Sequence, residues 1–342
     1  MAGVNVGVGS SGQLVSPEVS VVIPCYNYGR FLRETVGSLQ KQSYQDWEAI
    51  IVDDGSVDDT ANCVAALAQE DARVLYVYQS NQGVSVARNR GAELARGKFV
   101  LFLDADDLLT ATKLQAHVEH FRRCPSVDIS YSKFRYFSDN KPDELFTNYE
   151  LDSQREWSRP VSGCGRVSFP VFIRKNNLPL QAAMFRHSLL QRAGLFEQGM
   201  RALEDWDYLL RCILRGACMS SLDDQKAMTL IRVHPGSATR NIAFTDYVDR
   251  VYRNVLIEIE RLRVFGREED ANFYAEFLQK TLFERARRKR NRLFKEKNSE
   301  VRDRILSSGL ANAGELSAIV REFGCMNCLR AYVGALIKYF AR

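Results

Sequence analysis

Polar residues follow three short, mainly apolar segments of the chain, each directly where the segment ends. The segments and the residues after them are 19–23 with Pro24-Cys25-Tyr26-Asn27, 48–52 with Asp53-Asp54-Gly55-Ser56, and 99–103 with Asp104-Ala105-Asp106-Asp107. If these segments are parallel strands of one sheet, their carboxyl ends meet at the edge where open α/β sheets bind ligands. The polar residues would then share one site.

Five of these residues are aspartates, whose charges would repel one another unless cations or hydrogen bonds compensate. Carboxylate oxygens are hard ligands, which suit Mg²⁺ or Mn²⁺ bound together with substrate phosphates. A cation site, a ligand rich in hydrogen-bond donors, or both would therefore explain the cluster. Each motif alone has a plainer interpretation, because Asp-Gly-Ser after a strand often forms a turn and a helix cap.

Segments with helical periodicity separate the apolar runs. Leu32, Val36 and Leu39 recur at helical spacing, and two more helices are predicted over residues 56–68 and 84–95. A further strand is predicted over residues 73–78. Strands that alternate with helices of 10–15 residues imply crossover units and a parallel sheet. The predicted fold class is therefore α/β, with a mostly parallel, Rossmann-like sheet.

The second half of the chain has less regular patterns. We predict a helix over residues 114–123, a strand over 129–137 and a helix over 203–214. Residues 138–180 are rich in Pro and Gly and are predicted to be irregular, which is typical of a substrate-binding loop or lid.

The C-terminal region is predicted to be helical from residue 244 onward. Its first apolar stripe consists of Phe244, Val248, Val251, Val255, Ile259 and Leu262, and a second stripe lies within residues 329–340. Residues 281–304 hold ten Lys or Arg and four Asp or Glu, a net charge of +6 against +5 for the whole chain. A solvated helix face and contact with an anionic membrane surface both explain this segment. The apolar stripes could likewise lie at a membrane or pack on protein.

Composition excludes several classes of protein. With 46% apolar and 26% charged residues in 342, the chain is neither disordered nor fibrous as a whole. Eight cysteines and no recognisable secretory signal predict reduced thiols in a cytoplasmic protein. Two short motifs are interpreted as incidental: the G-x-G-x-x-G of residues 7–12, which Pro17 follows, and the lone C-x-x-C of residues 325–328.

Taken together, the motifs resemble the inverting family 2 glycosyltransferases of the GT-A fold. The segments that carry the resemblance are 22–27, 51–56, Asn81-Gln82-Gly83-Val84-Ser85-Val86-Ala87-Arg88-Asn89, 102–107, Arg192-Ala193-Gly194-Leu195-Phe196 and Glu204-Asp205-Trp206-Asp207. The order and spacing agree most closely over residues 18–120. The layout that this implies is a disordered leader (1–17), a GT-A catalytic domain (18–240) with a nucleotide-sugar half (18–124) and an acceptor half (125–240), and a helical C-terminal region (241–342).

The resemblance also implies roles for single residues. The nucleotide sugar would be bound by Pro24, Tyr26, Asn27, Asp54, Arg88, Asp104 and Ala105. The divalent metal, Mg²⁺ or Mn²⁺, would be held by Asp104 and Asp106, with His234 either completing the site or acting as a structural loop histidine. Asp205 would be the catalytic base, and Glu204 and Trp206 would contact the acceptor.

The implied function is a metal-dependent inverting glycosyltransferase that takes a sugar from a nucleotide diphosphate sugar, a UDP-sugar by preference. Its acceptor would be a saccharide or lipid-linked saccharide used in cell-surface polysaccharide or glycolipid synthesis. We expect a cytoplasmic protein, with peripheral contact at the inner face of the plasma membrane as an option, and no nucleic-acid partner. The alternative is a catalytically inactive nucleotide-sugar-binding or scaffold protein. A sugar-phosphate nucleotidyltransferase is disfavoured, because residues 24–27 lack a Gly-rich phosphate loop.

Overall fold

The computed structural model describes residues 16–154, 160–237 and 245–307, and the side chains within these ranges except 245–246 and 289–307. It divides into two compact units, Met1–Ala275 and Glu276–Arg342. The G-x-G-x-x-G segment, Phe244, the C-x-x-C motif and the second apolar stripe lie outside the described residues.

The first half of the chain forms regular crossover units. Its strands are β1 (Val19–Cys25), β2 (Trp47–Asp54), β3 (Val74–Gln79) and β4 (Phe99–Phe102), and the helices between them are α1 (Gly29–Gln40), α2 (Thr60–Glu70) and α3 (Val84–Leu94). The four strands are parallel, in the order β3-β2-β1-β4. This confirms the predicted α/β fold.

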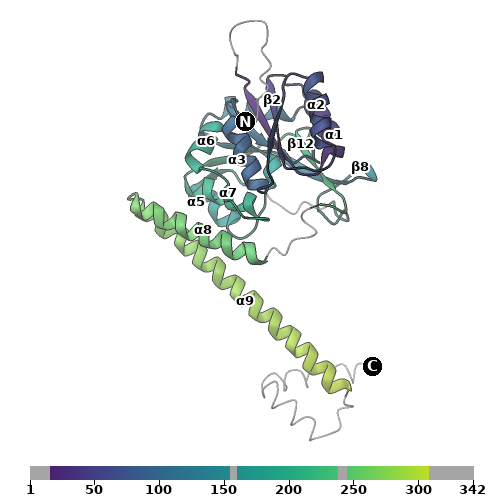
Figure 1. Cartoon of the computed structure of the whole chain (residues 1–342). Helices are drawn as coiled ribbons and strands as arrows, with labels where there is room; N and C mark the ends of the chain where they lie inside the picture. The colour runs from purple at the N-terminus through teal and green to yellow at the C-terminus, as the bar shows by residue number, and fades with distance from the viewer. Residues whose placement is uncertain (1–15, 155–159, 238–244, 308–342) are drawn as a thin grey trace. The chain divides into compact units, whose positions relative to one another are not determined.

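Helices cover both faces of this sheet, with α1 and α2 on one side and α3, α6 (His187–Ala193) and α7 (Glu204–Leu214) on the other (Figure 1). Val21 and Ile23 of β1 share a core with Leu32 of α1. Val22 faces α3, where a Cβ on Gly91 would lie 2.2 Å from Val22 Cγ1. Glycine therefore allows α3 to lie close against β1.

Helix α2 begins at Thr60 rather than at the predicted residue 56. The Asp58 carboxylate accepts hydrogen bonds from the Thr60 N–H at 3.1 Å and from the Gly29 N–H at 3.0 Å. These bonds hold the loop after β2 against the start of α1. The two strand ends that carry the first polar motifs are thereby fixed next to each other.

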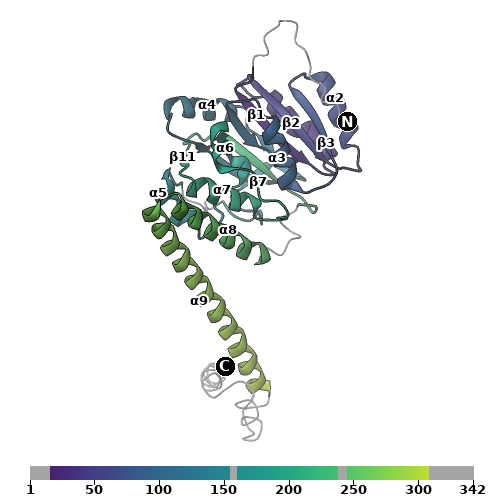
Figure 2. The same cartoon turned by 60° about the vertical axis from the view of Figure 1, so that its left-hand side comes forward.

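The second half adds short strands to the sheet and builds a smaller one. The eight-stranded sheet continues from β4 with β10 (Ala183–Arg186), β6 (Ile129–Tyr131), β11 (Cys218–Ser221) and β9 (Gly163–Cys164). The four-stranded sheet has the order β5 (Leu108–Leu109), β12 (Met228–Val233), β7 (Lys133–Ser138) and β8 (Lys141–Phe146). Strand β10 is antiparallel to both β4 and β6, so the sheet is mixed here. Figure 2 labels β7 and β11 of this half together with its helices α4, α5, α6 and α7.

The prediction of one strand over residues 129–137 is wrong. The chain leaves the large sheet at Ser132 and enters the small one as β7. Ser132 donates its N–H to the Ala182 carbonyl at 3.0 Å, and its Oγ accepts from Lys113 Nζ, in α4 (Lys113–Arg123), at 2.7 Å. These contacts stabilise the interruption at Ser132. It could not be predicted from the sequence, because residues 129–137 form an uninterrupted run of strand-forming residues.

Residues 138–180 are also more regular than predicted. They contain β8, β9 and α5 (Gly165–Phe172), followed by the 3₁₀ helix η1 (Leu180–Ala182). Pro170 lies inside α5. A proline this close to the end of a short helix removes one hydrogen bond, and the buried Phe169 and Phe172 anchor the helix by packing.

The expectation that all thiols are reduced is wrong for one pair. Cys164 of β9 and Cys218 of β11 form a disulfide, with Cα atoms 3.9 Å apart. The antiparallel register places these two residues directly opposite each other. Cys25, Cys63, Cys124 and Cys212 are free. A pairing between residues 54 positions apart depends on strand register, which cysteine spacing does not encode.

Two long helices follow the sheets, α8 (Thr245–Val264) and α9 (Glu268–Ser307). Helix α8 belongs to the unit that ends at Ala275 and packs against α7. Four residues of its predicted stripe are buried, namely Val251, Val255, Ile259 and Leu262. Packing on protein therefore accounts for this stripe. Within the described ranges, we find no helix that has both the length and the apolar character needed to cross a membrane.

Ile259→Ala should destabilise the protein far more than Ile257→Ala. Ile259 is fully buried, whereas Ile257, two residues away on the same helix, is 47% exposed. Removing a buried isoleucine side chain costs about 2–5 kcal/mol, and exposed changes cost about 0.5 kcal/mol. The free energy of unfolding in urea measures both. Equal losses in the two variants would contradict the packing of α8 on α7.

Candidate active site

The carboxyl ends of β1, β2 and β4 open into one cavity of about 650 Å³. Its lining brings together nine of the predicted site residues from the donor and acceptor halves: Pro24, Tyr26, Asp54, Arg88, Asp104, Ala105, Asp106, Glu204 and Asp205. The structure therefore has a cavity at the sheet edge where the sequence predicted a site. Asn27, Trp206 and His234 do not line it.

Asp54, at the end of β2, organises the loop that begins α3. Its Oδ1 accepts from Gln79 Nε2 at 2.7 Å and the Gln82 N–H at 2.9 Å, and its Oδ2 accepts from the Gly83 N–H at 2.8 Å. Asn27 instead joins the first two strand ends, because its Oδ1 accepts from the Val57 N–H at 2.8 Å. Its place is beside the cavity rather than in its wall.

Asp106, in the cavity wall, contacts His234, which does not line the cavity. His234 Nε2 lies 3.1 Å from Asp106 Oδ2, and the Gly236 N–H donates to His234 Nδ1 at 3.1 Å. Because Nδ1 accepts, the neutral ring carries its proton on Nε2 and donates it to Asp106. Burial and the nearby charge of Asp104 raise the Asp106 pKa to about 6.

The carboxylates of Asp104 and Asp106, with the imidazole of His234, fit a cation that takes its other ligands from a substrate. In the part of the chain that the structure describes, no cluster of three or more His, Cys, Asp or Glu could hold a metal alone. Mg²⁺ commonly uses one or two protein carboxylates together with phosphate oxygens. Asp106 with its imidazole neighbour and the partly exposed Asp104 meet that requirement once a diphosphate is bound.

Asp107 also borders the cavity, but it is buried and its oxygens are bonded to other parts of the protein. It accepts from the Arg232 N–H at 2.9 Å and from Gln181 Nε2 at 2.7 Å. Burial and the charges of Asp106 and Asp104 raise its pKa well above the ordinary value. Asp107 thus connects the end of β4 to β12 and η1.

Arg88 of α3 links the two halves of the site. Its guanidinium donates to Asp104 Oδ1 at 2.9 Å and to Glu204 Oε1 at 2.6 Å. Arg88 is 5% exposed. Burial by itself lowers the Arg88 pKa, but the carboxylates of Asp104 and Glu204 more than compensate and raise it.

Asp205 lies in the first turn of α7. This helix begins directly after Leu203, whose φ of 62° is unusual for a residue other than glycine. Its Oδ1 accepts from the Trp206 N–H at 2.7 Å and its Oδ2 from Asn176 Nδ2 at 3.0 Å. Burial and the charge of Glu204 raise the Asp205 pKa to about 6. A carboxylate with such a pKa suits a general base near neutral pH.

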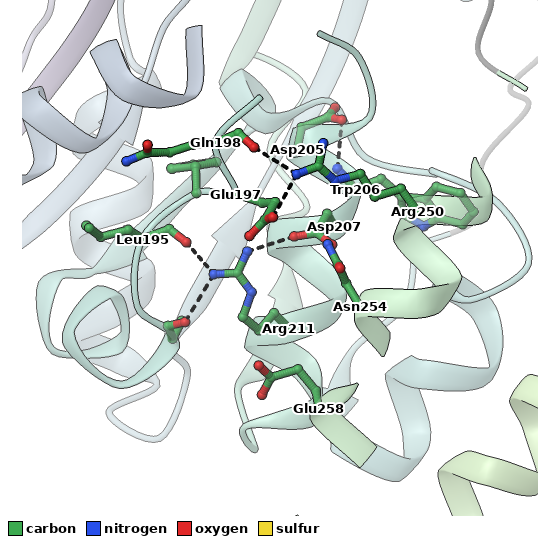
Figure 3. A network of polar contacts seen from close by, with 12 residues as sticks. Leu195, Glu197, Gln198, Asp205, Trp206, Asp207, Arg211, Arg250, Asn254 and Glu258 are labelled. Carbon is green, nitrogen blue, oxygen red and sulfur yellow. Dashed lines mark hydrogen bonds and ion pairs between the residues drawn. The ribbon is translucent and has the colours of Figure 1, made fainter. Parts of the chain in front are cut away.

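Trp206 differs from the expectation that it contacts an acceptor. Its ring is 3% exposed, Nε1 donates to the Phe172 carbonyl at 2.7 Å, and the ring meets Tyr252 edge to face. Asp207 has a structural role: it accepts from Arg211 at 2.7 Å and from Asn254 at 2.9 Å (Figure 3). The first two residues of the motif, Glu204 and Asp205, therefore line the cavity, and the last two lie in the core.

The motifs quoted from the sequence extend over the part of the chain that a family model recognises. Residues 20–191, half of the chain, match the family described as Glycosyl transferase family 2. The chain belongs to this family. As a family 2 member it is a glycosyltransferase, an enzyme class shared by the relatives below.

Two relatives from Bacillus subtilis (strain 168) carry glycosyltransferase names. The uncharacterized glycosyltransferase EpsJ is 26% identical over 266 residues, which are 75% of this chain and 74% of EpsJ. The putative teichuronic acid biosynthesis glycosyltransferase TuaG is 40% identical over 119 residues, which are 34% of this chain and 47% of TuaG.

A solved structure shares the fold. TarS residues 1–349 from S. aureus, crystallised in complex with UDP-GlcNAc, has a TM-score of 0.60 at 21% identity and covers 76% of this chain and 71% of its own. This likeness confirms the GT-A fold of the family 2 enzyme described here. The identity is too low to transfer the ligand.

Sequence reasoning missed three residues of this site. Asn176 comes from the loop before η1, Tyr136 from β7 and Arg232 from β12, and all three line the cavity. Tyr136 and Arg232 have no flanking motif, and Asn176 sits in a segment predicted to be irregular. Strands β7 and β12 pair in parallel within the four-stranded sheet, a long-range pairing that local sequence patterns do not encode.

Replacing Arg88 with leucine should destabilise the protein by about 3–5 kcal/mol, because it leaves Asp104 and Glu204 without their buried cation. Arg90→Leu is the matched control: Arg90 lies on the same helix, is exposed, and pairs with Glu93 at 3.5 Å. That pair should be worth no more than about 1 kcal/mol. Urea denaturation of both variants tests this, and an Arg88 variant as stable as the control would refute the bridging role.

Proposed function

We propose that this glycosyltransferase moves a sugar from a nucleotide diphosphate sugar to an acceptor hydroxyl in one displacement that inverts the anomeric carbon. One observation carries the proposal. A single cavity is lined by Asp104 and Asp106 on the donor side and by Asp205, a buried carboxylate with a raised pKa, on the other side.

Asp205 acts as the base in this reaction. Its carboxylate takes the proton of the acceptor hydroxyl while the hydroxyl oxygen forms a bond to the anomeric carbon. The bond from that carbon to the diphosphate oxygen breaks, and the nucleoside diphosphate leaves with the electron pair. A single displacement requires no enzyme nucleophile. Glu204, held by Arg88, lies beside the base and orients the acceptor.

The donor side binds the nucleotide and its diphosphate. The side chain of Tyr26, which is 47% exposed, would lie along the nucleobase, with Pro24 and Asp54 next to it. Asp104 and Asp106, with His234, would hold Mg²⁺ or Mn²⁺, which neutralises charge on the leaving diphosphate. Arg88 and Ala105 would adjoin the ribose and phosphates. Asn27 would support this wall from behind.

We further propose UDP as the nucleotide and a saccharide or lipid-linked saccharide as the acceptor, in the synthesis of a cell-surface polysaccharide or glycolipid. The UDP-GlcNAc complex named for TarS and the teichuronic acid pathway named for TuaG support this. The basic segment 281–304 would serve a lipid-linked acceptor by meeting anionic head groups from the cytoplasmic side. Liposome sedimentation at low salt tests that contact.

Asp205→Asn should abolish most sugar transfer while leaving donor binding intact. The amide keeps the shape of the side chain but cannot accept a proton, so turnover should fall about 10²–10⁴-fold. Transfer to acceptor and UDP binding by calorimetry are the two measurements. Transfer near the wild-type rate would mean that Asp205 is not the base, and full activity loss together with lost UDP binding would point to misfolding.

Asp106→Ala should remove the metal dependence of UDP binding. Calorimetry with Mn²⁺ and with chelator separates this effect from Asp54→Ala, which should weaken binding equally under both conditions because Asp54 shapes the loop before α3. If Asp106→Ala binds UDP with the same response to Mn²⁺ as the wild type, Asp106 is not a metal ligand.

A further inference from the structure

The Asp205 carboxylate has one side-chain hydrogen-bond donor among the described residues. Asn176 Nδ2 donates to Oδ2 at 3.0 Å, whereas Oδ1 accepts the N–H of Trp206 at 2.7 Å. Trp206 follows Asp205 on α7 and moves with it. Asn176 belongs to the loop between α5 and η1. The orientation of the carboxylate relative to the cavity therefore depends on Asn176.

The backbone beneath Asp205 is held separately. Figure 3 shows Asp207 turned away from Asp205, toward Arg211 and toward Asn254 of α8. Arg250 of α8 donates to Glu197 at 2.8 Å and to the Gly199 carbonyl at 3.1 Å, in the segment that leads to α7. These contacts fix the first turn of α7 without touching the Asp205 carboxylate. The backbone of Asp205 is therefore held by α8, whereas its side chain is held by Asn176.

Asn176 is itself oriented for this contact. Its Oδ1 accepts the Leu178 N–H at 3.4 Å, which turns Nδ2 toward Asp205. The adjacent Asn177 faces elsewhere: its Nδ2 donates to the Val171 carbonyl at 3.4 Å, and it does not line the cavity. Two neighbouring asparagines therefore offer a test residue and a control.

Other groups near Asp205 act on its charge from three sides. Glu204, from the same turn of α7, disfavours the ionised carboxylate, and Arg88 of α3 favours it. Tyr136 of β7 lies close enough for the Asp205 charge to raise the pKa of its hydroxyl. Against this background, a donated N–H stabilises the charged form and disfavours protonation.

We propose that Asn176 is a positioning residue for the base: its amide holds the Asp205 carboxylate in one orientation and keeps it ionised until the acceptor hydroxyl delivers its proton. This role rests on the proposed function of Asp205. The amide neither gains nor loses a proton. The lone pairs that Trp206 and Asn176 leave free on Asp205 are those that receive it.

The direction of the effect follows from the hydrogen bond. Without the Asn176 donor, the pKa of Asp205 rises above its value of about 6. An ionic hydrogen bond of this kind is worth roughly one pH unit or more. The acid limb of the pH–rate profile should therefore move to higher pH, with the largest loss of kcat near pH 6 and recovery toward pH 8.5.

The test titrates Asp205 directly, by ¹³C NMR of full-length protein with aspartate labelled at Cγ and the signal assigned by its absence in Asp205→Asn. In Asn176→Ala the midpoint should rise by about one pH unit, and in the nearly isosteric Asn176→Asp it should rise further because a like charge replaces the donor. Asn177→Ala should titrate as the wild type does.

A wild-type midpoint in both Asn176 variants would overturn the proposal, and so would an equal shift in Asn177→Ala, because a general loosening of the loop would then be the cause. If Asn176→Ala does not fold, Asn176→Asp alone decides. The titration needs no substrate, so it can succeed even where Asp205→Asn retains transfer. Retained transfer in Asp205→Asn would contradict the assignment of Asp205 as the base, but it would not contradict the hydrogen bond between Asn176 and Asp205.

Discussion

The guanidinium of Arg88 is the contact on which the geometry of the site depends. It lies in α3 of the first crossover units, yet its two partners, Asp104 and Glu204, begin the donor and acceptor sides. A buried arginine with two carboxylates is stable only while all three charges remain together. Because Glu204 precedes Asp205 directly, this ion cluster also fixes the position of Asp205, the proposed base, relative to the Asp-x-Asp motif.

The same cluster explains why acidic groups so close together can differ in role. Burial raises the pKa of Asp106, Asp107 and Asp205 alike, but each has different partners. The carboxylate oxygens of Asp107 accept hydrogen bonds from Arg232 and Gln181, so Asp107 has a structural role. Asp106 contacts His234 and lines the cavity. Asp205 faces the cavity with lone pairs free, so geometry rather than acidity separates the proposed metal ligand Asp106, the structural Asp107 and the proposed base Asp205.

The donor half could be predicted from sequence, because each of its strands, turns and helices is recognisable from consecutive residues. The rules for parallel crossover units then place Asp54 and Asp106 at one edge of the sheet. The acceptor half could not. Strand β10 has four residues and pairs antiparallel with β4 and β6, and Ser132 breaks an apparently continuous strand. Asn176 acquires its role only through these long-range pairings, and Trp206 shows that a residue inside a motif can belong to the core.

The supports of the base extend past the segment that defines the family. The matched region ends at residue 191, whereas α7 carries Asp205 and α8 anchors it through Asn254 and Arg250. Helix α8 is therefore part of the catalytic body, and its buried stripe is satisfied by α7 rather than by a membrane. In the proposed reaction Asp205 of α7 activates the acceptor, so mutations that loosen α8 should impair acceptor activation before they impair donor binding.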